Sequence, residues 1–141
     1  MKNLQRILAL DFGLKRTGIA VTDESNIIAT GLKTIDSKNL MQELKELIDK
    51  FNIGTIVLGE PKRLNAEDTH ISENVRQLKI ALSKNFPKVS IEMMDERFTS
   101  KIAFDAILAS GISKKKRQDK GLVDEVSATI ILQDYLGKIT R

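Results

Sequence analysis

The 141-residue chain contains no cysteine, two prolines and a single histidine, and only 4% of its residues are aromatic. Without cysteine it can form no disulfide framework, no thiolate zinc site and no cysteine nucleophile. The histidine, His70, lies near the start of a predicted helix, and we interpret it as a surface residue rather than as a base. No histidine or cysteine network therefore competes with the carboxylates for a chemical role.

Long hydrophobic runs are also missing. The first six residues are predominantly polar, and the apolar run at residues 7–10 is too short for a signal peptide or a membrane-spanning helix. The length fits one domain with one core. We therefore expect a single soluble domain over residues 1–141, located in the cytoplasm and without a membrane partner.

The excess positive charge is concentrated in one short stretch. The net charge is +4, and residues 114–120 contain five basic residues and one acidic residue, whereas the rest of the chain contains 18 of each. We call residues 114–120 the basic segment. Such a concentration of charge favours a phosphate-rich partner such as a nucleic acid. A solvated basic loop is the alternative interpretation.

Hydrophobic periodicity predicts strands that alternate with helices in the second half of the chain. The first three strands form a meander, with the turn formers of residues 23–26 before the third. The predicted strands cover residues 7–10, 17–22, 27–35, 55–58 and 89–95, and the predicted helices cover residues 40–51, 71–82, 99–111 and 123–136. The order βββαβαβαα requires parallel crossovers, so it predicts an α/β domain with a mixed five-stranded sheet.

An unusual combination of residues follows the first strand. Asp11 closes the buried run and is followed by Gly13, Lys15, Arg16 and Gly18. A carboxylate at the end of a buried strand is costly unless a cation balances it, and glycines permit a tight turn and a close approach to a ligand. The segment therefore favours a metal or phosphate site at a strand end. The alternative is that Asp11 only caps the strand and accepts hydrogen bonds from turn amides.

Three further carboxylates follow predicted strand ends, where ligands bind in sheets of this class. Glu60 follows the fourth strand in a Gly-Glu-Pro turn, and Asp95 and Glu96 end the fifth. Alternation places Asp95 and Glu96 on opposite faces of the sheet, and spacing alone does not choose between them. A structural ion pair between Glu96 and Arg97, and an ordinary turn at Glu60, are the alternatives.

Asp124 lies on the apolar face of the last predicted helix, together with Ala128, Ile131, Leu132 and Tyr135. Its inward direction indicates a function, whereas the alternative is a favourable charge in the first helical turn. Several carboxylates brought together would repel one another without a cation. With Mg²⁺ or Mn²⁺ they form an oxygen-ligand site, and two such ions can activate a water and stabilise the leaving oxygen in phosphodiester cleavage.

The order of elements and these carboxylates together resemble the ribonuclease H-like fold. More specifically, the chain resembles the YqgF (RuvX-like) family of pre-16S rRNA nucleases, which are related to Holliday-junction resolvases. The motifs that carry the resemblance occur in family order across nearly the whole chain: residues 10–18, LDFGLKRTG; residues 57–61, VLGEP; residues 95–100, DERFTS; residues 120–124, KGLVD; and residues 131–136, ILQDYL.

The resemblance implies an acidic catalytic and metal-binding site formed by Asp11, Glu96 and Asp124, which selects Glu96 over Asp95. It also implies Mg²⁺ or Mn²⁺ as cofactor, endonuclease activity on structured nucleic acid, a cytoplasmic location and a part in maturing the 5′ end of pre-16S rRNA. Glu60 stands where many members of the family carry leucine, and it is either a fourth metal ligand or an unrelated polar substitution.

Basic residues near these motifs are the candidate nucleic-acid contacts. The resemblance assigns Lys15, Arg16 and Arg97 to basic positions that contact phosphates. The other candidates lie in the loop after the fourth strand and in the basic segment: Lys62, Arg63, Lys114, Lys115, Lys116 and Arg117.

Three other functions share parts of this pattern. Residues 11–18 also resemble the first phosphate-binding motif of the actin, sugar-kinase and heat-shock ATPase superfamily, but this chain without a repeat lacks the second half that those proteins use. A module that binds nucleic acid without cutting it would also be basic, although clustered carboxylates weaken phosphate binding unless a metal bridges them. A Holliday-junction resolvase would use the same chemistry on branched DNA, and the sequence identifies no reader of the 2′-hydroxyl group.

Overall fold

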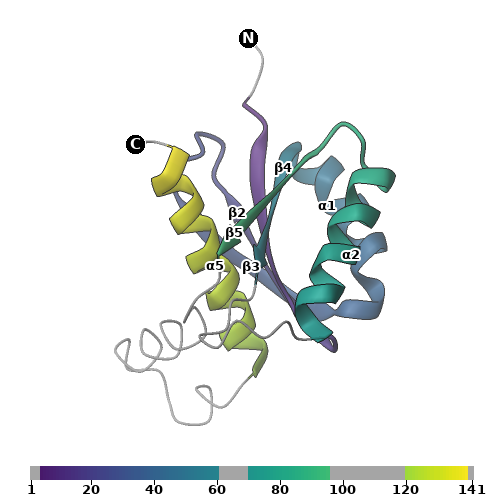
Figure 1. Ribbon diagram of the computed structural model, residues 1–141. Coiled ribbons are helices and arrows are strands. Elements are labelled where there is room, and N and C mark those ends of the chain that lie inside the picture. The colour runs from purple at the N-terminus through teal and green to yellow at the C-terminus, as the bar shows by residue number, and fades with distance from the viewer. Residues whose placement is uncertain (1–3, 61–69, 96–119, 140–141) are drawn as a thin grey trace.

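The computed structural model describes residues 4–60, 70–95 and 120–139 (Figure 1). Its strands are β1 (Arg6–Phe12), β2 (Arg16–Thr22), β3 (Ala29–Asp36), β4 (Ile53–Glu60) and β5 (Ser90–Asp95). Its helices are α1 (Leu40–Phe51), which follows a 3₁₀ turn at Ser37–Asn39, α2 (His70–Asn85) and α5 (Lys120–Ile139). Each element that the sequence predicts within these residues is present.

The five strands form one sheet in the order β3-β2-β1-β4-β5. Short connections make β1, β2 and β3 antiparallel neighbours, whereas β4 and β5 run parallel to β1 because α1 and α2 provide the crossovers. The predicted mixed sheet is confirmed. The parallel strands end at the same edge of the sheet, where Leu10 pairs with Leu58 and Glu60 pairs with Asp95.

Helices cover both faces of the sheet, with α1 and α2 on one side and α5 on the other (Figure 1). Leu8 and Leu10 of β1 belong to the core beneath α1 and α2. Ile7 and Ala9 belong to the core beneath α5. Because successive side chains of a strand alternate between faces, Asp11 lies on the α5 face.

The apolar stripes predicted for the helices form these two cores. The buried apolar residues of the helices are Leu40, Leu44 and Leu47 in α1, Val75, Leu78 and Leu82 in α2, and Ala128, Ile131, Leu132 and Leu136 in α5. Full burial of one leucine contributes roughly 1.5–3 kcal/mol relative to exposure. The stripes therefore fix both helix layers against the sheet.

Strand β3 begins at Ala29, two residues later than the sequence predicts. The Asp23 carboxylate accepts hydrogen bonds from the backbone amides of Ile27 at 2.7 Å and Ile28 at 2.9 Å, so these amides belong to the turn rather than to the sheet. Both isoleucines are exposed. The bonds from Ile28 and then Ile27 also hold the pKa of Asp23 below its ordinary value. The predicted start of the strand was wrong because the Asp23 side chain binds backbone amides that would otherwise pair in the sheet.

Helix α5 is longer than predicted and begins at Lys120, the last residue of the basic segment. The predicted helix over residues 99–111 and the rest of the basic segment lie outside the described residues. Across residues 4–60, 70–95 and 120–139, none of the helices has the length and apolar character that a membrane crossing requires.

Candidate functional site

The site begins at the tight turn between β1 and β2. Asp11 pairs with Gly18 across the two strands, and the Gly13 amide donates to the Arg16 carbonyl oxygen at 2.9 Å to close the turn. A Cβ atom on residue 13 would lie 2.7 Å from that oxygen, so the turn requires glycine there. The geometry therefore confirms the predicted tight turn directly after Asp11.

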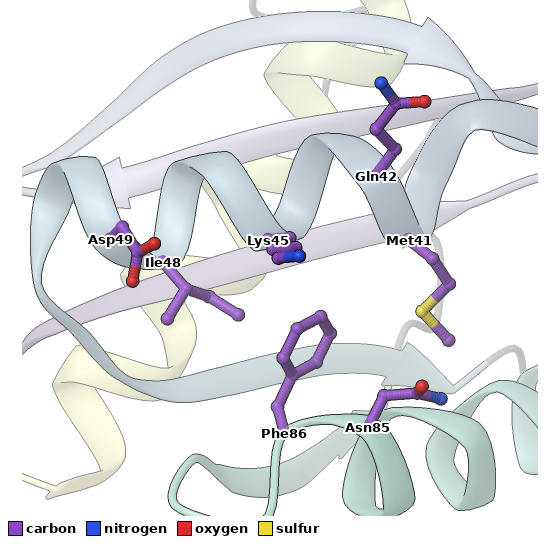
Figure 2. A pocket seen from close by; sticks show the side chains of 7 residues that line it. All are labelled: Met41, Gln42, Lys45, Ile48, Asp49, Asn85 and Phe86. Carbon is purple, nitrogen blue, oxygen red and sulfur yellow. The ribbon is translucent and has the colours of Figure 1, made fainter.

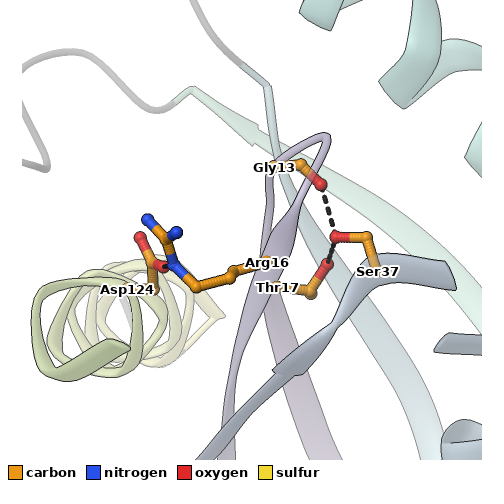
Figure 3. Close-up of polar contacts among 5 residues, drawn as sticks. All are labelled: Gly13, Arg16, Thr17, Ser37 and Asp124. Atoms are coloured by element: carbon orange, nitrogen blue, oxygen red, sulfur yellow. Dashed lines mark hydrogen bonds and ion pairs between the residues drawn. The ribbon is translucent and has the colours of Figure 1, made fainter. Parts of the chain in front are cut away.

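Ser37 ties this turn to the end of β3 (Figure 3). Its backbone amide donates to the Lys15 carbonyl oxygen at 2.9 Å, and its hydroxyl donates to the Gly13 carbonyl oxygen. Since a hydroxyl has one proton, the Thr17 hydroxyl is then the donor in its 2.8 Å hydrogen bond with Ser37 Oγ. These bonds hold the turn from both sides. No sequence pattern indicated this role, because Ser37 and Gly13 are 24 residues apart.

Gly18 lies where α5 contacts β2, and the predicted approach of this segment to a ligand stays a prediction. A Cβ atom on residue 18 would lie 2.0 Å from the backbone oxygen of Asp124 and 2.9 Å from the backbone nitrogen of Glu125. The first described turns of α5 therefore rest directly on the backbone of β2. Directly opposite residues of antiparallel strands have Cα atoms about 4.5–5.5 Å apart. This contact thus brings Asp124 close to the strand position where Asp11 lies.

Asp124 points inward, as its position on the helical face predicts. Its carboxylate oxygen Oδ2 lies 3.0 Å from Nε of Arg16, and the two side chains are 24% and 38% exposed (Figure 3). Arg16 and Asp124 are 108 residues apart, and the sequence predicted no contact between them. The predicted phosphate contact of Arg16 stays a prediction, and the structure adds that its guanidinium already holds a carboxylate of the site.

Lys15 lies at the exposed tip of the same turn. It lines a shallow hollow of about 260 Å³ together with Leu14, Asp36 and Lys38. Lys15 is exposed, and Leu14 is 63% exposed. The side chain of Lys15 is thus accessible from solvent, and its phosphate contact stays a prediction.

The other end of the site is formed by the last residues of β4 and β5. Met94 packs in the core beneath α5, whereas Ile91 and Met93 pack on the opposite face. Glu92 lies near Tyr135 of α5: the pKa of the Tyr135 hydroxyl is raised first by burial and then by the negative charge of Glu92. Even-numbered positions of β5 therefore face α5, the same side as Asp11.

Two further predicted site residues lie at the ends of neighbouring parallel strands. Glu60 and Asp95 are backbone neighbours at the ends of β4 and β5, and their side chains lie outside the described part of the chain. The remaining candidates also lie outside it: Glu96, Arg97, Lys62, Arg63, Lys114, Lys115, Lys116 and Arg117.

The donor chemistry of Asp11 and Asp124 fits a hard divalent cation, since carboxylate oxygens are the ligands that Mg²⁺ and Mn²⁺ prefer. The described residues contain no group of three or more histidine, cysteine or acidic side chains that could hold a metal by itself. Within the described ranges, Asp11 and Asp124 are therefore the two candidate carboxylate ligands at this edge of the sheet.

A pocket of about 550 Å³ lies between α1 and the end of α2, on the opposite side of the sheet from Asp11 (Figure 2). Apolar side chains of Met41, Ile48 and Phe86 line it, with Lys45 and Asp49 as its charged residues. It has no cluster of carboxylates, so it does not compete with the strand edge as a site of metal chemistry.

Comparison with known proteins identifies the family. The sequence profile of RuvX, described as "Holliday junction resolvase", matches residues 5–138. The chain belongs to the RuvX family. A relative in Flavobacterium psychrophilum is 49% identical over 133 residues, which cover 94% of this chain and 97% of that protein. One in Porphyromonas gingivalis is 47% identical and covers 96% of this chain and 99% of that protein. Both relatives carry the name "Putative pre-16S rRNA nuclease".

Solved structures confirm the predicted ribonuclease H-like fold of this RuvX chain. RuvC from Thermus thermophilus, in complex with a Holliday junction substrate, has a TM-score of 0.58 and 14% identity, with 97% of this chain and 96% of that chain covered. The yeast mitochondrial Holliday junction resolvase Ydc2 has a TM-score of 0.54 and 12% identity, with 96% and 79% covered. At this identity the likeness concerns the fold alone.

Proposed function

We propose that this RuvX protein is a divalent-metal-dependent endonuclease that hydrolyses phosphodiester bonds in structured RNA. The 5′ end of pre-16S rRNA is its substrate and the cytoplasm its location. The observation that carries the proposal is the contact between α5 and Gly18, which places Asp124 on the face and at the edge of the sheet where Asp11 lies. The names of the RuvX relatives support the same reaction class and substrate.

We assign the catalytic and metal-binding carboxylates to Asp11, Asp124 and Glu96. Glu96 is the next even-numbered position after β5, and the described even-numbered residue Met94 packs beneath α5. This parity supports Glu96 over Asp95. In β4 the residues with the parity of Glu60, Ile56 and Leu58, pack beneath α1 and α2, so the proposal leaves Glu60 out of the ligand set.

When bound, Mg²⁺ or Mn²⁺ would lower the pKa of a coordinated water and stabilise negative charge on the leaving oxygen. The protein's own residues supply the rest of the reaction. The carboxylates of Asp11 and Asp124 would hold the cation at the strand edge, and the turn fixed by Ser37 keeps Asp11 in place. Lys15 at the exposed tip and Arg16 beside Asp124 attract the phosphate backbone of the substrate.

The test compares two substrates, a 5′-extended rRNA precursor and a four-way DNA junction, each with Mg²⁺, with Mn²⁺ and with excess EDTA. We expect cleavage of the RNA with either metal and none with EDTA. Full activity in EDTA would contradict the metal-dependent mechanism. Preferential cutting of the DNA junction would identify a resolvase, and tight binding without cutting would identify a binding module.

The basic segment offers a second test of this function. Replacing Lys114, Lys115 and Lys116 with glutamine should weaken RNA binding and flatten its salt dependence. Each lost phosphate contact reduces the slope of log K against log salt by roughly 0.7–0.9, so three contacts correspond to a change of about 2 to 3. The measurement is a series of RNA-binding titrations between low and high salt.

A matched control removes the same charge elsewhere. Lys45, Lys79 and Lys84 are exposed on α1 and α2, which lie across the sheet from Asp11. Replacing these three with glutamine should leave the salt slope nearly unchanged. An equal change in both triple variants would mean that the basic segment acts only through net charge.

A further inference from the structure

We propose that Arg16 makes metal binding and phosphate binding interdependent, because it is the counter-ion of Asp124 in the free protein and the receptor of a substrate phosphate in the complex. This inference rests on the proposed function. It goes further because it identifies Arg16 as the residue that couples the binding of the metal ion to the binding of the substrate phosphate.

The contact between Arg16 and Asp124 uses only part of the guanidinium. Nε of Arg16 lies 3.0 Å from Oδ2 of Asp124. Among the described residues, neither of the terminal nitrogens, Nη1 and Nη2, has a hydrogen-bond partner. A guanidinium has five donors, so four N–H groups stay available on a side chain that is 38% exposed. Their planar arrangement suits the oxygens of a phosphate.

Both partners of this ion pair are held by the backbone. The Arg16 carbonyl accepts from the Gly13 amide, and Arg16 pairs with Asp36 in the sheet. Asp124 is fixed because α5 rests on Gly18. An ordinary surface ion pair is weak partly because two mobile side chains must be ordered. Here the fold fixes both backbones and the side chains are only 38% and 24% exposed, so we expect the pair to be better ordered in the free protein than a fully exposed pair.

The pair opposes the entry of a cation. A positive guanidinium beside Asp124 repels a metal ion and occupies one oxygen that the ion needs. A phosphate at Nη1 and Nη2 neutralises that guanidinium and draws it from the carboxylate, so the affinity for metal rises. By thermodynamic reciprocity, bound metal raises the affinity for the phosphate by the same factor.

The experiment measures the Mn²⁺ affinity of the free full-length protein by electron paramagnetic resonance, and the Mn²⁺ concentration for half-maximal cleavage at saturating precursor RNA. In the wild-type protein, the Mn²⁺ concentration for half-maximal cleavage should be clearly lower than the dissociation constant for Mn²⁺ in the free protein. In Arg16→Gln the free protein should bind Mn²⁺ roughly threefold to tenfold more tightly, the range for one partly exposed charge pair. The dissociation constant for Mn²⁺ in the free protein, divided by the Mn²⁺ concentration for half-maximal cleavage, should fall by a similar factor.

Two further variants sharpen this test. Arg16→Lys keeps the positive charge, so its Mn²⁺ affinity should stay near the wild-type value, while its single ammonium serves the phosphate less well. Arg76→Gln removes an arginine that pairs with Glu73 at 3.1 Å on α2, and it should leave both Mn²⁺ constants unchanged. Thermal unfolding of all variants checks that the fold is intact.

The outcomes separate this inference from the proposed function. If wild-type protein binds Mn²⁺ and cleaves RNA but Arg16→Gln has an unchanged or weaker Mn²⁺ affinity, the coupling role of Arg16 is wrong and the nuclease function stands. If wild-type protein neither binds Mn²⁺ nor cleaves either substrate, the proposed function fails and the inference fails with it.

Discussion

Replacing Asp11 with asparagine should reduce cleavage of the precursor RNA by roughly two to three orders of magnitude, the loss typical when a group that stabilises charge in the transition state is removed. Asparagine has nearly the same shape, but it lacks the negative charge that we propose holds a cation at the end of β1. The measurement is a single-turnover cleavage rate at saturating Mg²⁺.

The Asp11→Asn variant should still fold and bind RNA. We expect the thermal unfolding temperature of Asp11→Asn to stay close to that of the wild-type protein. RNA binding in EDTA should be as tight or tighter, because a carboxylate that repels phosphate has been neutralised. Asp49→Asn, which neutralises an exposed carboxylate on α1, is the control and should cleave normally. Undiminished cleavage by Asp11→Asn would exclude Asp11 from the catalytic site.

Replacing Gly18 with alanine should have the second largest effect. The new methyl group would lie 2.0 Å from the backbone oxygen of Asp124, whereas ordinary contacts begin near 3.4 Å. The start of α5 would have to move away from β2 and carry Asp124 with it. We expect a loss of about 1–3 kcal/mol in the free energy of unfolding. A displacement of about 1 Å at a catalytic group should lower the cleavage rate on the order of 10²-fold.

Gly137→Ala provides the matched control in the same helix. Among the described residues, and apart from the adjoining backbone of α5 itself, a Cβ atom on residue 137 would have no neighbour within 4 Å. Alanine should therefore stabilise α5 by roughly 0.5–1 kcal/mol through its better helix propensity, without changing cleavage. Chemical denaturation and single-turnover cleavage of both variants make the comparison. Wild-type activity in Gly18→Ala would show that cleavage does not depend on how α5 seats Asp124.

The sequence predicts the parts of the fold that depend on local patterns. The buried run before Asp11, the apolar stripe that includes Asp124 and the alternation in β5 are all periodicities, and the structure has each of them. The strand boundary at Ile27 was wrong because Asp23 binds the backbone amides locally, which a pattern of β-branched residues does not reveal.

The contacts that assemble the site could not be predicted in this way. The Ser37 hydroxyl reaches Gly13, and Arg16 reaches Asp124, across separations of 24 and 108 residues. Only the order of strands and the path of α5 bring these residues together. Likewise, residue 18 has no room for a Cβ atom because the backbone of α5 lies against it, whereas its sequence context indicates only a turn or a close approach to a ligand.

The direct backbone contact between α5 and Gly18 fixes the position of the N-terminal part of that helix. No side chain separates the two backbones there, so their distance is insensitive to changes of side-chain size elsewhere in the core. We expect a substitution near the C-terminal end of the helix, such as at Leu136, to displace that end more than it displaces Asp124. We therefore expect substitutions in the core beneath α5 to disturb the position of Asp124 less than a substitution of Gly18 does.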